Sequence, residues 1–321
     1  MSTPVLRPAT SDDLPAIHSV LLRAEAADDV ARVMEFDEMC EELDDARIPF
    51  ATHVRVAEVH GDVVGYVYAL HLPSEVKEER CYLFGNVDPA HRGLGVGRAL
   101  MTWGIGQARS LLESTGRDLP RHVRLQISES ATSAHALMGA MGFGIVRYID
   151  ELIRPLDDVA AMPAPAAVDG ITIVPWPDGR DEEIRREKND AFMDHWGSTP
   201  SSVEDWHAQV HGFGARPDLS FVALDDEDRV VAHALNHRYE ADDELLGRSE
   251  AWIDSLGTLE AWRGRGVASA LIVRSLQAFA EAGLTHAALA VDSENPTGAS
   301  RLYRSLGFGP STRSIVHDLA V

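Results

Sequence analysis

The sequence is poor in cysteine and in basic residues, and each shortage excludes a class of protein. Its 321 residues include two cysteines, too few for a disulfide framework or a zinc site built on thiolates. Neither Cys40 nor Cys81 lies in a motif, so we expect neither to act as a nucleophile. Lysine and arginine total 29 against 51 acidic residues, a formal net charge of −22. Because nucleic-acid binding depends on basic surface, we expect no nucleic-acid partner.

Long apolar runs are missing too. No stretch approaches the ~20 apolar residues of a membrane helix, so we expect no membrane partner. The start of the chain has neither the basic segment nor the apolar run of a secretory signal, which favours the cytoplasm. No spacing of histidine and carboxylate residues indicates a metal site, and we expect no metal cofactor.

What the sequence does contain is a repeat. The stretch HRGLGVGRALMTWG (91–104) has the layout of WRGRGVASALIVRSL (262–276), and the two equivalent arginines are 171 positions apart. Around each copy the pattern predicts a strand, a helix, a hairpin and a strand before the turn, then a helix, a strand, a short helix and a closing strand. A tandem duplication with domains at 1–158 and 170–321, joined by an Ala- and Pro-rich linker at 159–169, follows from this order.

The glycine-rich turn between a strand and a helix is a way to bind phosphate. Glycines let the backbone approach a ligand, and the free N–H groups of a helix start attract an anion. The small residues recur at every second position, so the dinucleotide fingerprint does not fit, and neither copy has the Gly-Lys-Ser/Thr of a P-loop. The pattern Arg-x-x-Gly-x-Gly/Ala fits both copies, whose residues are Arg92, Gly93, Leu94, Gly95, Val96 and Gly97, and Arg263, Gly264, Arg265, Gly266, Val267 and Ala268.

With these two turns, the strands beside them and the ending ASRLYRSLGF, nearly the whole chain resembles the GCN5-related N-acetyltransferase (GNAT) superfamily, and in particular its tandem two-domain type, to which mycothiol synthase belongs. The resemblance implies an α/β (α+β) fold of two GNAT domains, each a twisted mixed sheet flanked by helices. It implies acetyl-CoA as co-substrate, its pyrophosphate on the turn and its pantetheine between two splayed strands. The residues implied to contact it further are Val87, Leu256, Gly257, Thr258 and Asn295.

The two halves differ at positions that matter for catalysis. Tyr303 of the second half aligns with Met138, and Asn295 aligns with Ser130. In the family the tyrosine often protonates the leaving thiolate, a role that a neutral phenol can fill and methionine cannot. The alternative is a core aromatic residue without a catalytic role. We therefore expect a catalytic second half and a degenerate or non-catalytic first half.

Removing a proton from the acceptor amine calls for a base or a water relay. The strand SEAWIDSLGT offers Glu250 and Asp254, an even number of residues apart and so on one strand face. The first-half segment CYLFGNV has no carboxylate, in keeping with a first half that does not turn over. A mechanism with no dedicated carboxylate stays open.

Two further segments bear on the acceptor. Residues 25–47 hold ten carboxylates and two arginines, which predicts either a solvated helical face or a field that attracts cationic substrates. Asp194, His195 and Trp196 fall where an acceptor pocket is expected, although His195 fits a structural role better than a catalytic one.

The function indicated is transfer of an acetyl group to a primary amine of a small, cationic molecule by direct attack in a ternary complex. An amino-sugar conjugate, an aminoglycoside-like compound or a mycothiol-precursor-like compound would suit as acceptor. The alternatives are a non-catalytic acetyl-CoA sensor or scaffold and a protein N-acetyltransferase.

Overall fold

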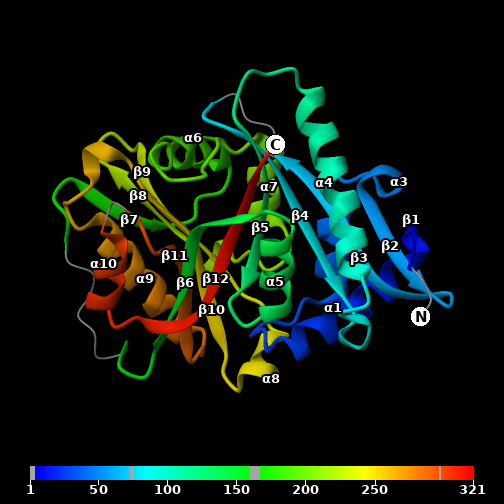
Figure 1. Ribbon diagram of the computed structural model, residues 1–321. Helices are drawn as coiled ribbons and strands as arrows, with labels where there is room; N and C mark the ends of the chain where they lie inside the picture. Colours follow the sequence, from blue (N-terminus) through cyan, green and yellow to red (C-terminus); the bar gives the residue numbers. More distant parts are fainter. Residues whose placement is uncertain (1–3, 73–75, 160–166, 296–297) are drawn as a thin grey trace. The chain divides into compact units, whose positions relative to one another are not determined.

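The computed structural model describes residues 4–72, 76–159, 167–295 and 298–321 (Figure 1). The chain forms two compact units, one made of Met1–Tyr148 with Arg313–Val321 and the other of Ile149–Thr312. Most of the expected linker, residues 160–166, lies outside the described residues.

The first unit is a mixed sheet with helices on both faces. Its strands are ordered β1-β2-β3-β4-β5-β12, with β4 and β5 parallel and the other neighbours antiparallel. Its elements are β1 (Val5–Pro8), α1 (Leu14–Ala27), α2 (Phe36–Leu43), α3 (Phe50–His53), β2 (Val54–Val59), β3 (Asp62–Leu72), β4 (Glu79–Val87), α4 (Val96–Ser114), β5 (Arg121–Ser128), α5 (Thr132–Ala140) and, from Arg313, β12 (Gly309–Ala320).

Alternating side chains of the first sheet supply two cores. Tyr66 and Tyr68 of β3 pack with α1 and α2, whereas Val67 and Ala69 pack with α4. Because successive strand residues point to opposite faces, α1 and α2 cover one face and α4 covers the other.

The second unit repeats this architecture. Its strands are ordered β6-β11-β10-β9-β8-β7, with β10 and β11 parallel and the other neighbours antiparallel. Its elements are, from Ile149, β6 (Gly144–Pro155), then β7 (Ile171–Pro175), α6 (Asp181–Ala191), α7 (Val203–His211), β8 (Phe221–Asp225), β9 (Val230–His237), α8 (Asp242–Leu246), β10 (Glu250–Thr258), α9 (Val267–Glu281), β11 (His286–Asp292) and α10 (Ala299–Ser305).

The second sheet also has a core on each face. Ala234 and Ile253 pack with α9, whereas Leu235 packs with Ile184 of α6 and Trp206 of α7. The face covered by α6 and α7 therefore carries Leu235 of β9 and also His233, which contacts Glu187 of α6.

The closing strands are exchanged between the halves. β6 follows the first half's α5 but pairs with β11, Asp150 opposite Val291, and β12 follows the second half's α10 but pairs with β5, Asp318 opposite Arg124 (Figure 1). The expected domains 1–158 and 170–321 placed β6 in the first domain and β12 in the second. In the compact units most of β6 belongs to the second unit and most of β12 to the first. The physical reason is the main-chain pairing, because β6 forms a ladder with β11 from Ile149 to Pro155 and β12 forms one with β5 from Ser314 to Ala320.

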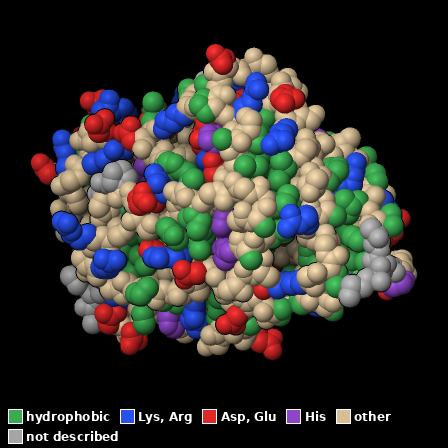
Figure 2. Space-filling model, in the orientation of Figure 1, with side chains coloured by type: hydrophobic (Ala, Val, Ile, Leu, Met, Phe, Trp, Pro, Cys, Tyr) green, Lys and Arg blue, Asp and Glu red, His purple; other side chains and the backbone are tan. Residues whose placement is uncertain are grey.

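The acidic segment 25–47 is not one helical face. It comprises the end of α1, a connection and α2, and Glu38 of α2 is 8% exposed and paired with Arg32. Glu42 accepts a 2.5 Å hydrogen bond from the Tyr68 hydroxyl. On the face drawn in Figure 2, acidic side chains are dispersed among basic ones.

Candidate active site

The glycines of the two turns hold backbone that other residues rarely adopt. Gly93 and Gly95 have φ of 73° and 88°, and Gly264 and Gly266 have φ of 73° and 91°. Gly95 and Gly266 are the residues immediately before α4 and α9. A glycine at a helix start costs helix propensity, but it supplies the left-handed conformation that turns the strand into the helix. An added Cβ at Gly93, Gly95 or Gly264 would lie in open space, so the turns present bare backbone to a ligand.

The residues that follow in each turn pack against the protein. Val96 and Val267, the first residues of α4 and α9, are each 1% exposed. A Cβ on Gly97 would come 3.1 Å from Leu137, whereas the equivalent Ala268 carries one. The valines anchor the helix starts, and the small residues keep the approach to the turn open.

The arginine that begins each turn is a structural anchor. Arg92 Nε donates to the carbonyl of Val87 at 3.3 Å, and Arg263 Nε donates to the carbonyl of Thr258 at 3.1 Å. Arg92 also makes two hydrogen bonds, of 2.6 and 2.8 Å, to Asp28. Both guanidinium groups thus tie the turn to the end of its own strand, which was not apparent from the motif.

A cation faces outward from the second turn. Arg265 stacks on Trp262, its guanidinium carbon 4.8 Å from the ring centroid, and its first-half equivalent is Leu94, which is 44% exposed. A guanidinium beside a helix N-terminus favours an anion, and an exposed leucine does not.

In both units the two parallel strands separate before the turn. Pairing of β10 with β11 ends at Ile253 opposite Leu289, and pairing of β4 with β5 ends at Tyr82 opposite Arg124. In the described part of the chain β10 then continues to Thr258 and β4 to Val87 without pairing to that neighbour. Leu256, Gly257 and Thr258 therefore lie along an open strand edge.

A β-bulge at Asp254 distinguishes β10 from β4. Ile253 lies opposite Asn236 and Ser255 opposite Leu235, so Asp254 is the extra residue, whereas β4 pairs with β3 in continuous register. The Asp254 side chain is 33% exposed and accepts a 2.8 Å hydrogen bond from Gln209 Nε2 of α7. The equivalent first-half residue is Leu83, which is buried.

Glu250 lies at the other end of β10. It is 3% exposed and pairs with Arg248 at 2.8 Å. The matching first-half residue is Glu79, fully buried and paired with Arg117, so the first-half strand does begin on a carboxylate that lies just outside the segment CYLFGNV. A buried, paired glutamate at the start of both strands is the pattern of a shared structural ion pair.

Tyr303 projects from α10 into the core beside α9. It is 9% exposed and its ring meets Phe308 edge-on with centroids 6.1 Å apart. Burial raises the pKa of Tyr303 to about 12, so its phenol is neutral at pH 7. Met138 is buried at the equivalent place in the first unit. Asn295 follows β11, its backbone N–H bonded to the carbonyl of Asp292.

The segment expected to face the acceptor is partly exposed. Asp194 has a side chain 73% exposed and lies 3.8 Å from Arg263. The His195 ring packs at a tilt against Phe192 with ring centroids 4.5 Å apart, and Trp196 is 36% exposed. None of the contacts just named reaches Asp254.

A chain of buried polar side chains beside Asp254 was missed by sequence reasoning. Ser255 Oγ lies 2.9 Å from His233 Nε2, and His233 Nδ1 lies 2.5 Å from Glu187 Oε2. His237, four residues along β9, has its Nε2 3.9 Å from the Asp254 carboxylate. The signal available was the spacing of the two histidines, which puts both on one strand face.

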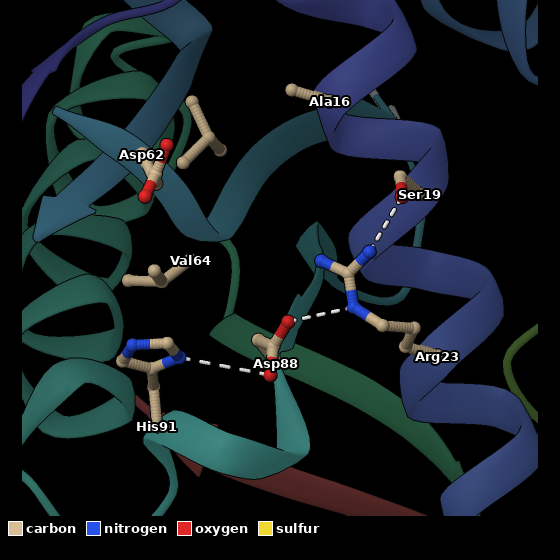
Figure 3. A pocket seen from close by; sticks show the side chains of 8 residues that line it. Ala16, Ser19, Arg23, Asp62, Val64, Asp88 and His91 are labelled. Carbon is tan, nitrogen blue, oxygen red and sulfur yellow. Dashed lines mark hydrogen bonds and ion pairs between the residues drawn. The ribbon is translucent and has the colours of Figure 1, made fainter.

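The first unit has a small pocket near its own turn, bounded by α1, the start of β3 and the residues after β4 (Figure 3). Arg23 donates to Asp88 at 2.7 Å and His91 faces the same carboxylate at 3.6 Å. Burial alone would raise the pKa of Asp88, but hydrogen bonds from the Ala90 N–H and Arg23 lower it. Arg23, Asp88 and His91 of this pocket thus interact with one another.

Among the described residues, no group of three or more His, Cys, Asp or Glu side chains is placed to hold a metal ion. A search of the same residues finds no helix long and apolar enough to cross a membrane.

The comparisons with known proteins agree with this architecture. The model of the acetyltransferase (GNAT) family matches residues 18–143 and 181–308, and the chain belongs to that family as an N-acetyltransferase. Each match ends just before an exchanged closing strand. The prediction of two GNAT domains of mixed α/β structure is confirmed.

Relatives and solved structures cover nearly the whole chain. A mycothiol acetyltransferase of Frankia alni is 30% identical over 324 residues, covering 97% of this chain and 92% of that protein. A GCN5-related N-acetyltransferase from Sphaerobacter thermophilus is 26% identical with a TM-score of 0.77, covering 99% of this chain and 95% of that one. A tandem GNAT protein from the clavulanic acid biosynthesis pathway, 20% identical, shares the fold with a TM-score of 0.71 over 99% and 98% of the two chains.

Proposed function

We propose that the second unit binds acetyl-CoA and transfers the acetyl group to the primary amine of a small molecule by direct attack in a ternary complex. One observation carries the proposal: the second unit combines the turn and the open strand edge with Asp254 and Tyr303. The first unit has the same frame, but Leu83 and Met138 stand at the equivalent positions. We infer that the first half is non-catalytic.

The second turn fits the phosphates of acetyl-CoA. Gly264 and Gly266 leave the space of a Cβ unfilled, and the first N–H groups of α9 lack intrahelical acceptors. Arg265 adds a cation that the first turn lacks. The open edge of β10 at Leu256 to Thr258 offers backbone groups to a pantetheine arm and to a thioester carbonyl. Acetyl-CoA, when bound, supplies the activated acetyl group.

Asp254 is the stronger candidate for the base. Its carboxylate is one-third exposed at a bulge, where an amine from solvent can reach it, whereas Glu250 is buried against Arg248. Tyr303 is the candidate acid. A free thiol has a pKa of about 8.5, well below that of Tyr303, so the phenol serves chiefly as a hydrogen-bond donor to the sulfur while the C–S bond breaks.

For the acceptor we propose an amino-sugar conjugate, such as a mycothiol-precursor-like compound. The support is the 30% identity to the Frankia alni protein along nearly the whole of both chains. An ammonium group on such a conjugate is complementary to the Asp254 carboxylate.

The test is thiol release from acetyl-CoA in the presence of an amino-sugar conjugate, an aminoglycoside and a lysine-containing peptide. We expect release to depend on an amine and to be fastest with the amino-sugar conjugate. Calorimetric binding of acetyl-CoA without release for any amine would contradict catalysis and favour a sensor. Preference for the peptide would overturn the small-molecule acceptor.

A further inference from the structure

Three buried side chains beside the proposed base form a continuous hydrogen-bonded chain. Glu187 of α6 is 4% exposed, His233 of β9 is 0% exposed and Ser255 of β10 is 6% exposed. Glu187 Oε2 lies 2.5 Å from His233 Nδ1, and His233 Nε2 lies 2.9 Å from Ser255 Oγ. This is the arrangement in which a carboxylate orients an imidazole and the imidazole accepts a proton from a hydroxyl.

The bulge brings Ser255 to this face of the sheet. Regular alternation would put Asp254 and Ser255 on opposite faces. Instead Asp254 meets Gln209 of α7, and Ser255 meets His233, whose side chain lies on the face covered by α6 and α7. The exposed carboxylate and the buried hydroxyl are therefore sequence neighbours on one face, where β10 has already separated from β11.

The protein keeps space for the histidine. A Cβ on Gly257 would come 2.4 Å from the His233 ring, so any residue other than glycine there would displace the imidazole. The ring is also bounded by Phe192 and by the edge of Trp206, with centroids 6.3 and 5.9 Å away. These contacts fix the orientation of the imidazole.

The two histidines of β9 have opposite hydrogen-bonding roles. His237 Nε2 lies 2.9 Å from the Gln209 carbonyl, which can only accept, so the His237 proton is on Nε2. His233 Nδ1 faces the Glu187 carboxylate, so its proton is on Nδ1 and its Nε2 lone pair faces Ser255. Of the two, His233 is the one arranged to act as a base.

We propose that Ser255, His233 and Glu187 are a proton relay for the acetyl transfer, a role that rests on the function proposed above. As the amine nitrogen bonds to the acetyl carbon, it gives a proton to Ser255 Oγ, and the Ser255 hydroxyl gives its own proton to His233 Nε2. In the transfer the C–N bond forms and the C–S bond breaks, so that CoA leaves as the thiolate beside Tyr303. In the relay one N–H and one O–H bond break, and one O–H and one N–H bond form. The positive charge moves from the nitrogen to an imidazolium paired with the Glu187 carboxylate. After the amide leaves, the proton returns through Ser255 to water.

The relay complements Asp254. An ammonium must lose one proton before it can attack and a second once the new bond has formed. Asp254, exposed to solvent, takes the first, and Ser255 takes the second within the protein. Ser255 is thus a catalytic residue in this proposal, and Glu187 is a positioning residue.

Ser255→Ala tests the relay, with Ser275→Ala as its matched control. Ser275 is a fully buried serine of α9 whose hydroxyl bonds Asn236 on the opposite face. We expect Ser255→Ala to lower kcat about 10²-fold or more, with unchanged acetyl-CoA affinity and a Tm similar to that of Ser275→Ala, which keeps the parent kcat. A Ser255→Ala kcat within twofold of the parent, or a loss fully explained by weaker acetyl-CoA binding, overturns the relay.

A second readout is independent of turnover. Nitrogen-15 NMR of the histidine rings should show His233 protonated on Nδ1 and His237 on Nε2, and Glu187→Gln should change the state of His233 alone. A doubly protonated His233 at the pH of the assay overturns the relay. If no amine supports thiol release, the proposed function fails while the NMR result stands. If release is normal in Ser255→Ala, the relay fails while the proposed function stands.

Discussion

Tyr303 and Met138 lie at equivalent positions of the two short helices, α10 and α5, and both are buried. Tyr303→Phe keeps the ring that packs on Phe308 and removes the hydroxyl. If the phenol assists departure of the thiolate, kcat should fall by about 10²–10⁴-fold while acetyl-CoA binds normally. If Tyr303 is only structural, the variant should keep nearly the parent kcat, and any effect of the substitution should be confined to the Tm. Measuring kcat and Tm on one preparation separates the two.

The raised pKa of Tyr303 makes a separate prediction about alkaline pH. Burial raises this pKa from 10 to about 12, so below pH 10 the phenol is neutral in the folded and unfolded states alike. Between pH 10 and 12 only the unfolded state ionises, and the free energy of unfolding falls as pH rises. Between pH 10 and 12 the Tm of Tyr303→Phe should therefore fall less than the Tm of the parent protein. Parallel declines of the two proteins would show that Tyr303 is not buried as described.

Asp254 and Glu250 should differ sharply when each is made neutral. Asp254→Asn is expected to lower kcat for the amine by about 10²-fold or more, with acetyl-CoA affinity unchanged. Glu250→Gln should lower Tm, because Arg248 loses its partner, and keep most of the turnover. Steady-state rates and melting curves of both variants provide the check. A larger loss of kcat in Glu250→Gln would reverse the assignment of the base.

At the scale of elements, the glycine turns were the most predictable feature. Glycines at 93, 95, 264 and 266 stand where helix propensity disfavours them, which signals a left-handed backbone, and all four have positive φ. The hydrogen-bond partners of the Arg92 and Arg263 side chains were not predictable. Each bonds a carbonyl five residues back, and a motif read along the chain does not distinguish that bond from one to a phosphate.

The bulge in β10 explains why sequence reasoning did not place Ser255 beside His233 in the candidate site. The segment SEAWIDSLGT alternates in a way that places Asp254 on one face and Ser255 on the other. The extra residue at Asp254 ends this alternation and turns Ser255 towards His233. Whether a strand bulges depends on its partner strand as well as on its own residues, so the local pattern does not contain the answer.

At the scale of the whole molecule, the exchanged closing strands make each unit depend on a distant part of the chain. β12 supplies Asp318 to the first unit, where it accepts hydrogen bonds from Arg124 at 2.8 Å and His122 at 2.5 Å. Arg124 is 2% exposed, and burial of its guanidinium is offset by the Asp318 charge, so that the pKa of Arg124 is raised. Sequence order alone assigns these partners to different domains.

Asp318→Ala is therefore expected to destabilise the first unit although it lies near the chain's end. Removing one member of a buried ion pair costs about 3–5 kcal/mol when the other charge is left without a partner. The loss here is expected to be smaller, because Arg124 keeps its 3.0 Å ion pair with Glu78. Hydrogen exchange should show faster opening of β5 and β4, with β10 and β11 unaffected. As a companion experiment, a fragment of residues 1–158 should aggregate, since it lacks β12 and exposes the edge of β5. A monomeric, fully folded fragment would contradict the exchange.

The most direct test of the account compares thiol release from acetyl-CoA by Gly266→Glu and Gly95→Glu. The two glycines are matched, because each precedes the main helix of its unit and their φ angles are 91° and 88°. Both variants carry the same backbone strain, and each puts a carboxylate where a phosphate is expected. The account predicts that Gly266→Glu abolishes amine-dependent release and acetyl-CoA binding to the second unit, while a folded Gly95→Glu keeps most of the parent rate. Loss of release in Gly95→Glu, with Gly266→Glu active, would contradict it by assigning catalysis to the first half.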